Sequence, residues 1–362
     1  MDDMPCHRPE AEEPAPMISE RPPECPQNWY LVAASKDITP GGVVTCSFGA
    51  HEIVVGRWGE NNAVYAFEAH CQHQGCHLRH ATAVKGGLRC ALHHRVIRHD
   101  GAFLFPDGSV NPSLRQRALP AREAFGGVFV FAGLSAAFDI PTPEIAQAGL
   151  ITTRYLEPRT FDVPWSTLIS NGIDIDHLQT VHDRRLLESP SLELLDTNRI
   201  RLRYRTAVTG SHLSDRIMKW LSNDEILGSI TCIGGSTILV ETRIRNRETF
   251  ILLSMSPTPS GGSTVRGLVG STGNPASVTS RLGVRLAAWL FQSFLEKDVG
   301  VLKDIAWHPP HSGISPGDGM MRRLYAFFCI QPEFATRQRP SAAAIRHPIP
   351  FERRTTLTDA ER

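Results

Sequence analysis

The chain has 362 residues and a formal net charge of +1 at pH 7, with 41% hydrophobic and 21% charged residues. This composition is typical of a soluble globular protein with two domains, and the near-zero charge argues against a nucleic-acid or anionic-membrane partner. No apolar run is long enough to span a membrane and the N-terminus lacks an apolar signal segment, so the sequence favours a cytoplasmic protein. Eight cysteines in a chain of this length favour reduced thiols or metal ligands over a disulfide scaffold.

The N-terminal part of the chain predicts a tail followed by an all-β domain. Residues 1–26 are rich in proline and acidic residues and are predicted to be a disordered tail. A small all-β domain is then expected over residues 27–140. Its strands are predicted from β-rich runs bounded by Gly, Asn and Pro, at 28–34, 51–58, 62–69 and 126–134.

The pattern changes after "FDIPTPE" to a mixture of helices and strands. Helices are predicted over 165–182, 211–222 and 281–306, and strands over 199–208, 236–245, 248–256 and 264–271. Helices that flank an antiparallel sheet predict an α+β, helix-grip-like domain over residues 141–335. Residues 336–362, rich in Arg and Pro, are predicted to be a C-terminal tail.

Cysteine and histidine are concentrated between residues 70 and 95 of the all-β domain. Cys71-x-His73 is followed by Cys90-x-x-His93, and two such pairs on neighbouring loops can present four ligands to one point. The candidates are a zinc ion and an iron–sulfur cluster. Structural zinc sites usually combine Cys–Cys and His–His pairs. Each pair here mixes one Cys with one His, which suits a [2Fe–2S] cluster held by two thiolates and two imidazoles.

These residues resemble the C-x-H and C-x-x-H boxes of the Rieske family. The resemblance implies that Cys71 and Cys90 bind the inner iron, and that His73 and His93 bind the outer one. Respiratory-type Rieske proteins join two further cysteines in a disulfide, and Cys76 matches the first of them. Leu92 stands where the second would be. The resemblance therefore favours the oxygenase branch over a respiratory electron carrier, with Cys76 as a small buried thiol.

The same stretch contains residues that the resemblance does not use. The second box departs from the oxygenase pattern without losing a ligand, at Ala91, Leu92, His94 and Arg95. Several histidines have no ligand position, and we expect them to lie in loops or on the surface: His70, His77, His80, His94 and His99.

A second motif, Asn171-x2-Asp174-x2-His177-x4-His182, lies about 80 residues further on. Two imidazoles and one carboxylate with open positions form the facial triad of non-haem Fe(II) enzymes that activate O2. By itself the motif also fits an acidic helix face that binds no metal. It closely resembles the mononuclear-iron box of Rieske oxygenases, which favours the metal site.

The resemblance also assigns the remaining residues of this site. The third ligand is expected on a later helix, where the family pattern selects Asp298, with Asp304 as the alternative. Glu296 and Lys297 are expected on a solvated helix face. Asp174, together with Asn171, is the catalytic candidate, because its counterpart connects the iron-bound histidine to a Rieske histidine of the adjacent subunit. This arrangement implies a ring of subunits, expected to be a homotrimer.

The resemblance covers most of residues 28–330 and implies a terminal oxygenase, a monooxygenase or dioxygenase with a Rieske [2Fe–2S] domain at 27–140 and a catalytic mononuclear iron domain at 141–335. The chain shows no nicotinamide or flavin motif, so a separate reductase or ferredoxin is expected to supply electrons. O2 and an apolar small molecule are the expected substrates, with monohydroxylation as the expected reaction.

Several alternatives stay open at this point. The same metals could support N-oxygenation of an arylamine or oxidative demethylation, and the chain resembles the branch that contains ketosteroid 9α-hydroxylase and aminopyrrolnitrin oxygenase. An electron-transfer protein without O2 chemistry and a zinc-stabilised binding module are the alternative classes. Four arginines on one strand face could dock an acidic ferredoxin, although a solvated face is the simpler interpretation: Arg199, Arg201, Arg203 and Arg205.

Overall fold

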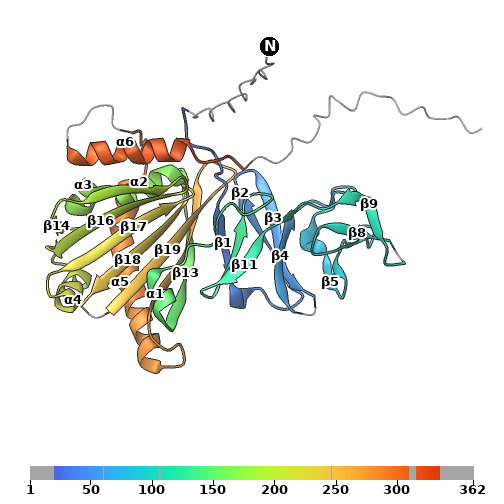
Figure 1. Ribbon diagram of the computed structural model, residues 1–362, viewed down its shortest axis with the longest axis horizontal. Coiled ribbons are helices and arrows are strands. Elements are labelled where there is room, and N and C mark those ends of the chain that lie inside the picture. Colours follow the sequence, from blue (N-terminus) through green and yellow to red (C-terminus); the bar gives the residue numbers. More distant parts are fainter. Residues whose placement is uncertain (1–19, 60, 106, 246, 310–314, 335–362) are drawn as a thin grey trace, which may run out of the picture.

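The computed structural model describes residues 20–59, 61–105, 107–245, 247–309 and 315–334. Most of the two predicted tails, at 1–26 and 336–362, lies outside these residues. The molecule is elongated, with the N-terminal strands at one end and a helix-flanked sheet at the other (Figure 1). Within the described residues no helix is both long and apolar enough to cross a membrane.

The N-terminal part consists of short strands and two 3-10 turns, as the sequence predicts. Its strands are β1 (Trp29–Ala34), β2 (Val43–Phe48), β3 (His51–Trp58), β4 (Ala63–Glu68), β5 (Thr82–Val84), β6 (Gly87–Arg89), β7 (Val96–Ile97), β8 (Ala102–Leu104), β9 (Val110–Arg115), β10 (Ala118–Leu119), β11 (Ala121–Ala124) and β12 (Gly127–Phe131). The turns are η1 (Ser35–Asp37) and η2 (Leu78–His80).

These strands form three antiparallel sheets, in the orders β1-β12-β11, β10-β4-β3-β2 and β5-β6-β7-β8-β9. The third sheet is built from short strands and lies at the far end of the molecule (Figure 1). The loops that connect β4 to β5 and β6 to β7 carry the two Cys/His boxes.

The C-terminal part alternates helices with longer strands. Its helices are α1 (Glu144–Ala148), α2 (Trp165–Ile173), α3 (Ile175–Thr180), α4 (Leu213–Ser222), α5 (Val278–Leu302) and α6 (Pro316–Cys329). Its strands are β13 (Ile151–Phe161), β14 (Arg184–Leu186), β15 (Ser191–Asp196), β16 (Arg199–Val208), β17 (Ile226–Ile233), β18 (Thr237–Ile244), β19 (Arg247–Pro257) and β20 (Ser263–Thr272).

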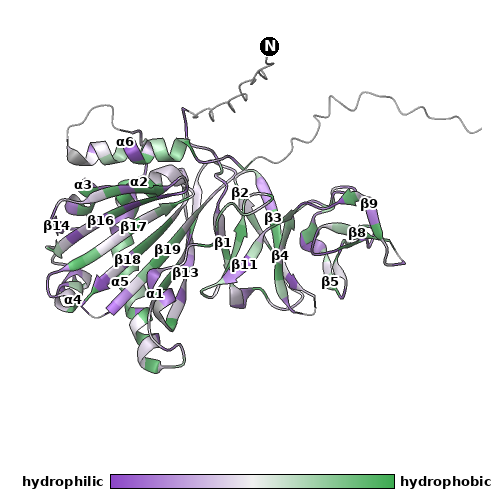
Figure 2. Ribbon diagram, viewed as in Figure 1, coloured by the Kyte–Doolittle hydropathy of each residue, from purple (hydrophilic) through white to green (hydrophobic). Residues whose placement is uncertain are grey.

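One antiparallel sheet, in the order β13-β20-β19-β18-β17-β16-β14 with β15 beside β16, organises this part. Successive side chains of a strand point to opposite faces, and β19 uses both faces. Leu253 packs with α2 and α6, whereas Phe250 and Leu252 pack with β1 and β12. Hydrophobic stretches therefore run along the central strands (Figure 2), because helices cover one face and the N-terminal domain covers part of the other.

The helix predicted over 165–182 is interrupted, and this corrects the sequence analysis. Asp174 has extended backbone angles and separates α2 from α3. Its Oδ1 accepts hydrogen bonds from the backbone N–H groups of Asp176 (2.8 Å) and His177 (3.1 Å), which makes it the N-cap of α3. The break gives the chain a new direction just before the two histidines of the second motif.

Helix α6 was not expected as a helix. Ser315 caps it in a reciprocal capping box with Asp318, and a proline occupies the first turn. Its apolar residues, including Leu324 and Phe328, are buried against Trp165 of α2. Tertiary burial of one face therefore stabilises this helix.

The predicted N-terminal tail ends earlier than residue 26. Cys25 is buried, and its N–H donates to Glu333 Oε1 at 2.9 Å. Pro26 forms a β-bridge with Glu333, and the Phe334 N–H donates to the Cys25 carbonyl at 2.7 Å. Residues 24–26 are therefore part of the folded body, paired with a segment more than 300 positions away.

Asn28 connects the two domains at their junction. Its side chain is fully buried, and Nδ2 donates to the Ile233 carbonyl (2.9 Å) and to Ser236 Oγ (2.9 Å) in the β17–β18 turn. Oδ1 accepts the N–H of Trp29 at 2.8 Å. Trp29 and Leu31 share a hydrophobic cluster with Phe250 and Leu252, so the amide lies in a water-excluded interface between the domains.

We expect Asn28→Ala to lower the free energy of unfolding by about 1–3 kcal/mol, because the Ile233 carbonyl and the Trp29 N–H would stay buried without a partner. Urea denaturation measures this change. Asn61→Ala is the control, because Asn61 is exposed in the β3–β4 turn and should change stability by less than about 0.5 kcal/mol. Equal stability of the two variants would contradict the role given to Asn28.

Candidate functional site

The two Cys/His boxes form loops with the same hydrogen-bond pattern. The Cys71 N–H donates to the Cys76 carbonyl (2.9 Å), and the Cys90 N–H donates to the Arg95 carbonyl (2.9 Å). Each cysteine carbonyl accepts the N–H of the residue four positions later, Gly75 or His94. Gly75 and His94 both have positive φ, +79° and +54°, so the two loops turn in the same way.

The four predicted cluster ligands divide by depth, and this matches the chemistry of a mixed cluster. Cys71 and Cys90 are each 3% exposed, whereas His73 is half-buried and His93 is exposed. The two imidazole rings lie 4.9 Å apart at 81°. Burial raises the pKa of the Cys71 thiol to about 11, so a cation is needed to hold it as a thiolate. The donor set therefore fits an inner iron on sulfur and an outer iron on nitrogen.

Cys76 lies beside this pair without a disulfide. All cysteines in the described part of the chain are free thiols. Cys76 is half-buried, and Leu92, which occupies the place of a partner cysteine, is 53% exposed. Burial and the neighbouring Cys90 raise the pKa of the Cys76 thiol.

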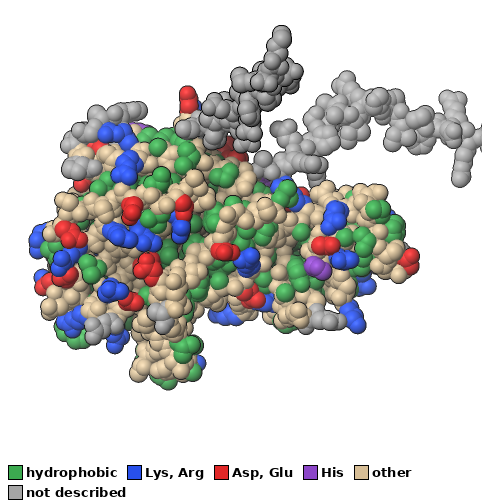
Figure 3. Space-filling view, viewed as in Figure 1, with side chains coloured by type: hydrophobic (Ala, Val, Ile, Leu, Met, Phe, Trp, Pro, Cys, Tyr) green, Lys and Arg blue, Asp and Glu red, His purple; other side chains and the backbone are tan. Residues whose placement is uncertain are grey.

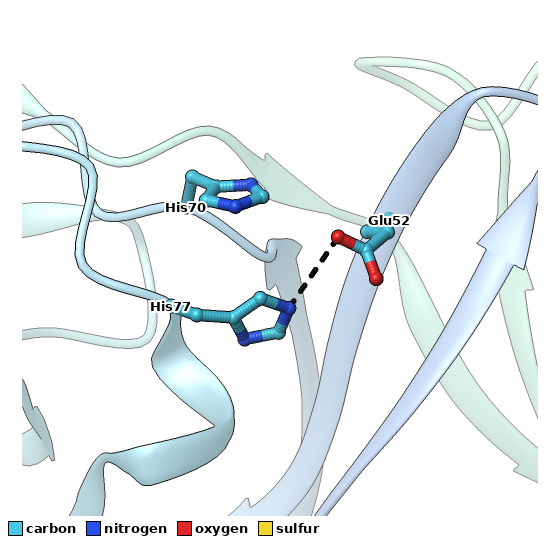
Figure 4. A group of neighbouring side chains, drawn as sticks. All are labelled: Glu52, His70 and His77. Atoms are coloured by element: carbon cyan, nitrogen blue, oxygen red, sulfur yellow. Dashed lines mark ion pairs between the residues drawn. The ribbon is translucent and has the colours of Figure 1, made fainter.

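A second cluster, of Glu52, His70 and His77, lies next to the boxes (Figure 4). His77 lies in the loop between β4 and β5, as expected, but its side chain is only 11% exposed. His77 Nδ1 accepts the N–H of Arg79 at 3.0 Å, so in the neutral ring Nε2 carries the proton and faces Glu52 at 3.5 Å. Since Nε2 could bind a metal only if this cap were broken, the cluster is better explained as a structural one.

The second motif brings three ligands to one point. His177 lies on α3, His182 lies two residues before the start of β14, and Asp298 comes from α5. His177 Nε2 lies 3.1 Å from His182 Nε2, and Asp298 Oδ1 lies 2.8 Å and 2.9 Å from these two nitrogens. Ligand atoms held at right angles about 2.1 Å from one ion are separated by about 3 Å. The donor set and its spacing therefore fit a metal ion held by a facial triad.

The alternative carboxylates do not approach this point. Asp304 is exposed in the turn after α5, with a φ of +60°. Glu296 is exposed and lies 3.6 Å from Arg159. The geometry thus favours Asp298 among the three candidates that the sequence offered.

Burial determines the charge of the triad. It lowers the pKa of His182, which is 2% exposed, so the imidazole is neutral and can offer Nε2 to a metal. Burial acts to raise the pKa of Asp298, but hydrogen bonds from His177 and His182 outweigh it, and the net pKa is lowered. The neutral His182 ring and the ionised Asp298 carboxylate leave a negative charge in a buried site, which a divalent cation would neutralise.

Asp174 and Asn171 occupy different positions near the triad. Asp174 is half-buried and caps α3, with its Oδ1 on two backbone N–H groups. The sheet β5–β9, with the cluster loops, lies at the opposite end of the molecule from α3 (Figure 1), so Asp174 faces no Rieske histidine of its own chain. Asn171 lines a cavity beside Asp298.

This cavity is small and mostly apolar, with a volume of about 90 Å³. Its apolar walls come from α2, α5 and the sheet, and include Leu156, Phe161, Leu168, Ile238, Leu253, Met255 and Leu302. A larger and more open hollow of about 690 Å³ lies between β13 and the start of α5 and contains no triad residue. The smaller cavity is therefore the one positioned for chemistry at the triad.

Four side chains near the triad were missed or misplaced by the sequence analysis: Phe294, Asp215, Arg184 and Lys297. Phe294 stacks on the ring of His182 with centroids 3.5 Å apart. Asp215 is buried against Arg184, and Lys297 reaches Asp215 at 3.2 Å. Lys297 is thus only 18% exposed, which corrects its assignment to a solvated face. Their positions in the sequence could have indicated a role near the site, because Arg184 lies two residues after His182 and Lys297 directly precedes Asp298.

The arginine face of β16 is largely ion-paired within the chain. Arg199 pairs with Asp196, Arg201 with Glu144, and Arg205 with Glu225. Acidic and basic side chains are interspersed on the face shown in Figure 3. These pairs agree better with a solvated strand face than with a docking site for an acidic ferredoxin.

We expect Asp298→Ala to abolish iron binding at the triad while the cluster is retained, because the carboxylate supplies the only charged ligand atom in that group. Asp304→Ala is the matched control and should retain iron. Iron and sulfide analysis of anaerobically prepared protein distinguishes the two. Loss of iron in the Asp304 variant alone would show that the third ligand is misassigned.

The chain resembles known proteins in sequence and in fold. The Rieske [2Fe–2S] domain family matches residues 28–107. Cholesterol 7-desaturase of Xenopus laevis is 28% identical over 188 residues, which cover 49% of this chain and 40% of the desaturase. The Bombyx mori desaturase is 26% identical over 180 residues, covering 47% of this chain and 38% of the relative. The matched part is therefore less than half the length of these curated relatives.

Solved structures share the fold over nearly the whole length. Dicamba monooxygenase bound to dicamba has a TM-score of 0.64 at 16% identity, covering 84% of this chain and 97% of that one. NdmA of Pseudomonas putida CBB5 with caffeine has a TM-score of 0.62 at 15% identity, covering 82% and 88%. The chain therefore combines a segment that matches the Rieske [2Fe–2S] domain family with a helix-flanked antiparallel domain that carries a candidate two-histidine, one-aspartate metal site, and it shares the fold of dicamba monooxygenase and NdmA.

Proposed function

We propose that the chain is a terminal oxygenase that uses O2 and externally supplied electrons to oxygenate an apolar small molecule. One observation carries the proposal: the same chain has a Rieske domain and, in a separate domain, a buried His–His–Asp triad beside an apolar cavity. An electron carrier needs only the Rieske domain. A zinc-stabilised binding module needs neither that domain nor a triad beside an apolar cavity.

The residues of each centre have distinct tasks in this proposal. When bound, the cluster supplies single electrons and the mononuclear iron supplies O2 activation. Cys71, Cys90, His73 and His93 would hold the cluster. His177, His182 and Asp298 would hold the second metal. Leu253 and Met255 give the cavity beside Asp298 an apolar wall, which would exclude water there.

The cavity supports a neutral, apolar substrate. Its volume of about 90 Å³ is below the roughly 300 Å³ of pockets that bury drug-sized ligands, so flexible Met and Leu side chains must move on binding. Arg159, the basic residue of the lining, is engaged with Glu296 and leaves little attraction for an acid. We therefore favour monohydroxylation of a hydrophobic ring compound.

The relatives give this proposal a direction and an alternative. The curated relatives are named for cholesterol, which is consistent with a sterol-sized apolar substrate. The similar solved structures hold dicamba and caffeine, so a smaller ring compound is the second candidate. Oxidative demethylation and arylamine N-oxygenation use the same centres and stay as alternatives. The proposed branch with ketosteroid 9α-hydroxylase and aminopyrrolnitrin oxygenase stays a prediction.

Electron delivery is proposed to cross a subunit boundary. The cluster loops and α3 lie at opposite ends of one chain (Figure 1), and His93 is exposed. Tunnelling over the length of the chain would be slow, so a second copy must place its cluster near Asp174. A closed homotrimer satisfies this requirement. A separate reductase or ferredoxin would load the cluster.

The proposal predicts about three irons and two sulfides per chain in anaerobically prepared protein. Metal analysis with the EPR spectrum of the reduced protein measures this. About two irons with a Rieske signal would instead indicate an electron-transfer protein, and zinc without sulfide would indicate a binding module. Either result would remove the oxygenase from consideration.

Asp174→Asn tests the electron path separately from the fold. Asn is as good a helix N-cap as Asp, so α3 and the stability should be retained to within about 0.5 kcal/mol. The bridging carboxylate would be lost, and we expect transfer from the reduced cluster to the triad iron to fall by at least about 10²-fold. Single-turnover oxidation of the cluster measures the rate. A rate equal to that of the unmodified protein would argue against the subunit bridge.

A further inference from the structure

A charged network behind the triad connects residues that are adjacent in sequence to two of its ligands. Lys297, next to Asp298 on α5, donates through Nζ to Asp183 Oδ2 (2.9 Å) and to Asp215 Oδ2 (3.2 Å). Asp183 directly follows His182. The network therefore joins the helix that carries the carboxylate to the loop that carries the second histidine.

Arg184 extends the network to the ring of His182. Its Nη1 donates to the His182 carbonyl (2.8 Å) and to Asp215 Oδ1 (3.1 Å). Its guanidinium also lies 5.6 Å from the centre of the Phe294 ring, which stacks on His182 at an angle of 6°. One arginine thus contacts both the backbone of the ligand and the aromatic ring that fixes the plane of its imidazole.

Burial makes this arrangement stiff. The side chains of Asp215, Arg184 and Lys297 are 4%, 8% and 18% exposed. Asp215 lies in the first turn of α4, where the helix dipole favours a negative charge. Two cations and two carboxylates balance, so no charge is left unpaired when the network is intact. A buried network of this kind has one satisfied geometry and costs free energy in any other.

His182 itself lacks the support that metal-bound histidines usually have. Such a histidine normally donates its second ring N–H to a carboxylate, a carbonyl or water. His182 Nδ1 is buried and has no hydrogen-bond partner among the described residues. The imidazole therefore depends on Phe294 stacking and on the backbone contact of Arg184 for its orientation.

We infer that Asp183, Arg184, Asp215 and Lys297, together with Phe294, form a positioning network that sets the distance and orientation of His182 relative to Asp298 and so tunes the affinity and symmetry of the mononuclear iron. These are positioning residues, since none of them contributes a ligand atom to the triad. The inference rests on the proposed iron site and concerns how this chain builds it.

Lys297→Met is the main test, because it cuts the connection between α5 and the His182 loop without leaving a buried charge. Asp215 keeps Arg184 as its partner, and the side chain of Asp183 is 44% exposed. We expect triad iron to dissociate into a chelator about 10-fold to 100-fold more readily than in the unmodified protein. The Rieske EPR signal in the same sample shows that the chain is folded.

Two further variants separate the parts of the network. Asp183→Asn keeps a residue that tolerates the positive φ of +52° and removes the negative charge that faces Lys297, so a several-fold weaker hold on iron is expected. Phe294→Leu should leave the affinity closer to normal but change the EPR line shape of the nitric oxide adduct of the triad iron, because the His182 plane is released. Lys219→Met, a surface change on α4, is the matched control.

The outcomes distinguish this inference from the proposed function. If the unmodified protein holds no triad iron, the proposed function fails. If it holds iron, and both Lys297→Met and Asp183→Asn release it at the rate of the control with an unchanged line shape, the positioning network is overturned. Should Lys297→Met also lose the Rieske signal through misfolding, Asp183→Asn decides alone.

Discussion

The molecule depends on removing two imidazoles and a carboxylate from water and directing all three at one point. Such a group is costly to bury, because an ionised carboxylate loses its hydration in the interior. In addition, the facing Nε2 atoms of His177 and His182 cannot both carry a proton without repelling each other. The fold tolerates this because three separate elements, α3, the segment before β14 and α5, meet there and are held by ion pairs behind them. Most of the C-terminal domain can be understood as the scaffold for that convergence.

Local features of the sequence predicted the parts of the site that lie close together along the chain. Each Cys/His box, and the pair of triad histidines, consists of residues only a few positions apart in the sequence. The strands predicted over 51–58 and 199–208 coincide with β3 and β16. Asp298 lies 121 positions from His177 and was selected by a family pattern, since no spacing rule connects residues so far apart. The burial of the Lys297 and His77 side chains was not predicted for the same reason. Burial of a polar side chain depends on distant partners, Asp183 and Asp215 in one case and Glu52 in the other.

The two loops of the cluster show how one geometry can be reached with different residues. Their hydrogen bonds match, and both turn through a left-handed residue. Glycine supplies that conformation in the first loop at no steric cost, whereas the second loop uses His94, for which the left-handed region costs roughly 1 kcal/mol or more. His94 is one of the positions where the sequence departs from the oxygenase pattern. The hydrogen bonds of the loop hold His94 in the left-handed conformation all the same.

The pairing of Cys25 and Pro26 with Glu333 and Phe334 changes what a domain means in this chain. Phe334 follows the last helix of the C-terminal domain, yet its ring is buried with Tyr30 and Phe48 in the core of the first. The polypeptide leaves the first domain near residue 140 and returns to it at residues 333–334. A single cut in the linker would consequently yield two incomplete pieces, one without its closing segment and one with an orphaned extension. The second domain is thus inserted into the first, and exchanging either domain with another protein would require two junctions, one near residue 140 and one before residue 333.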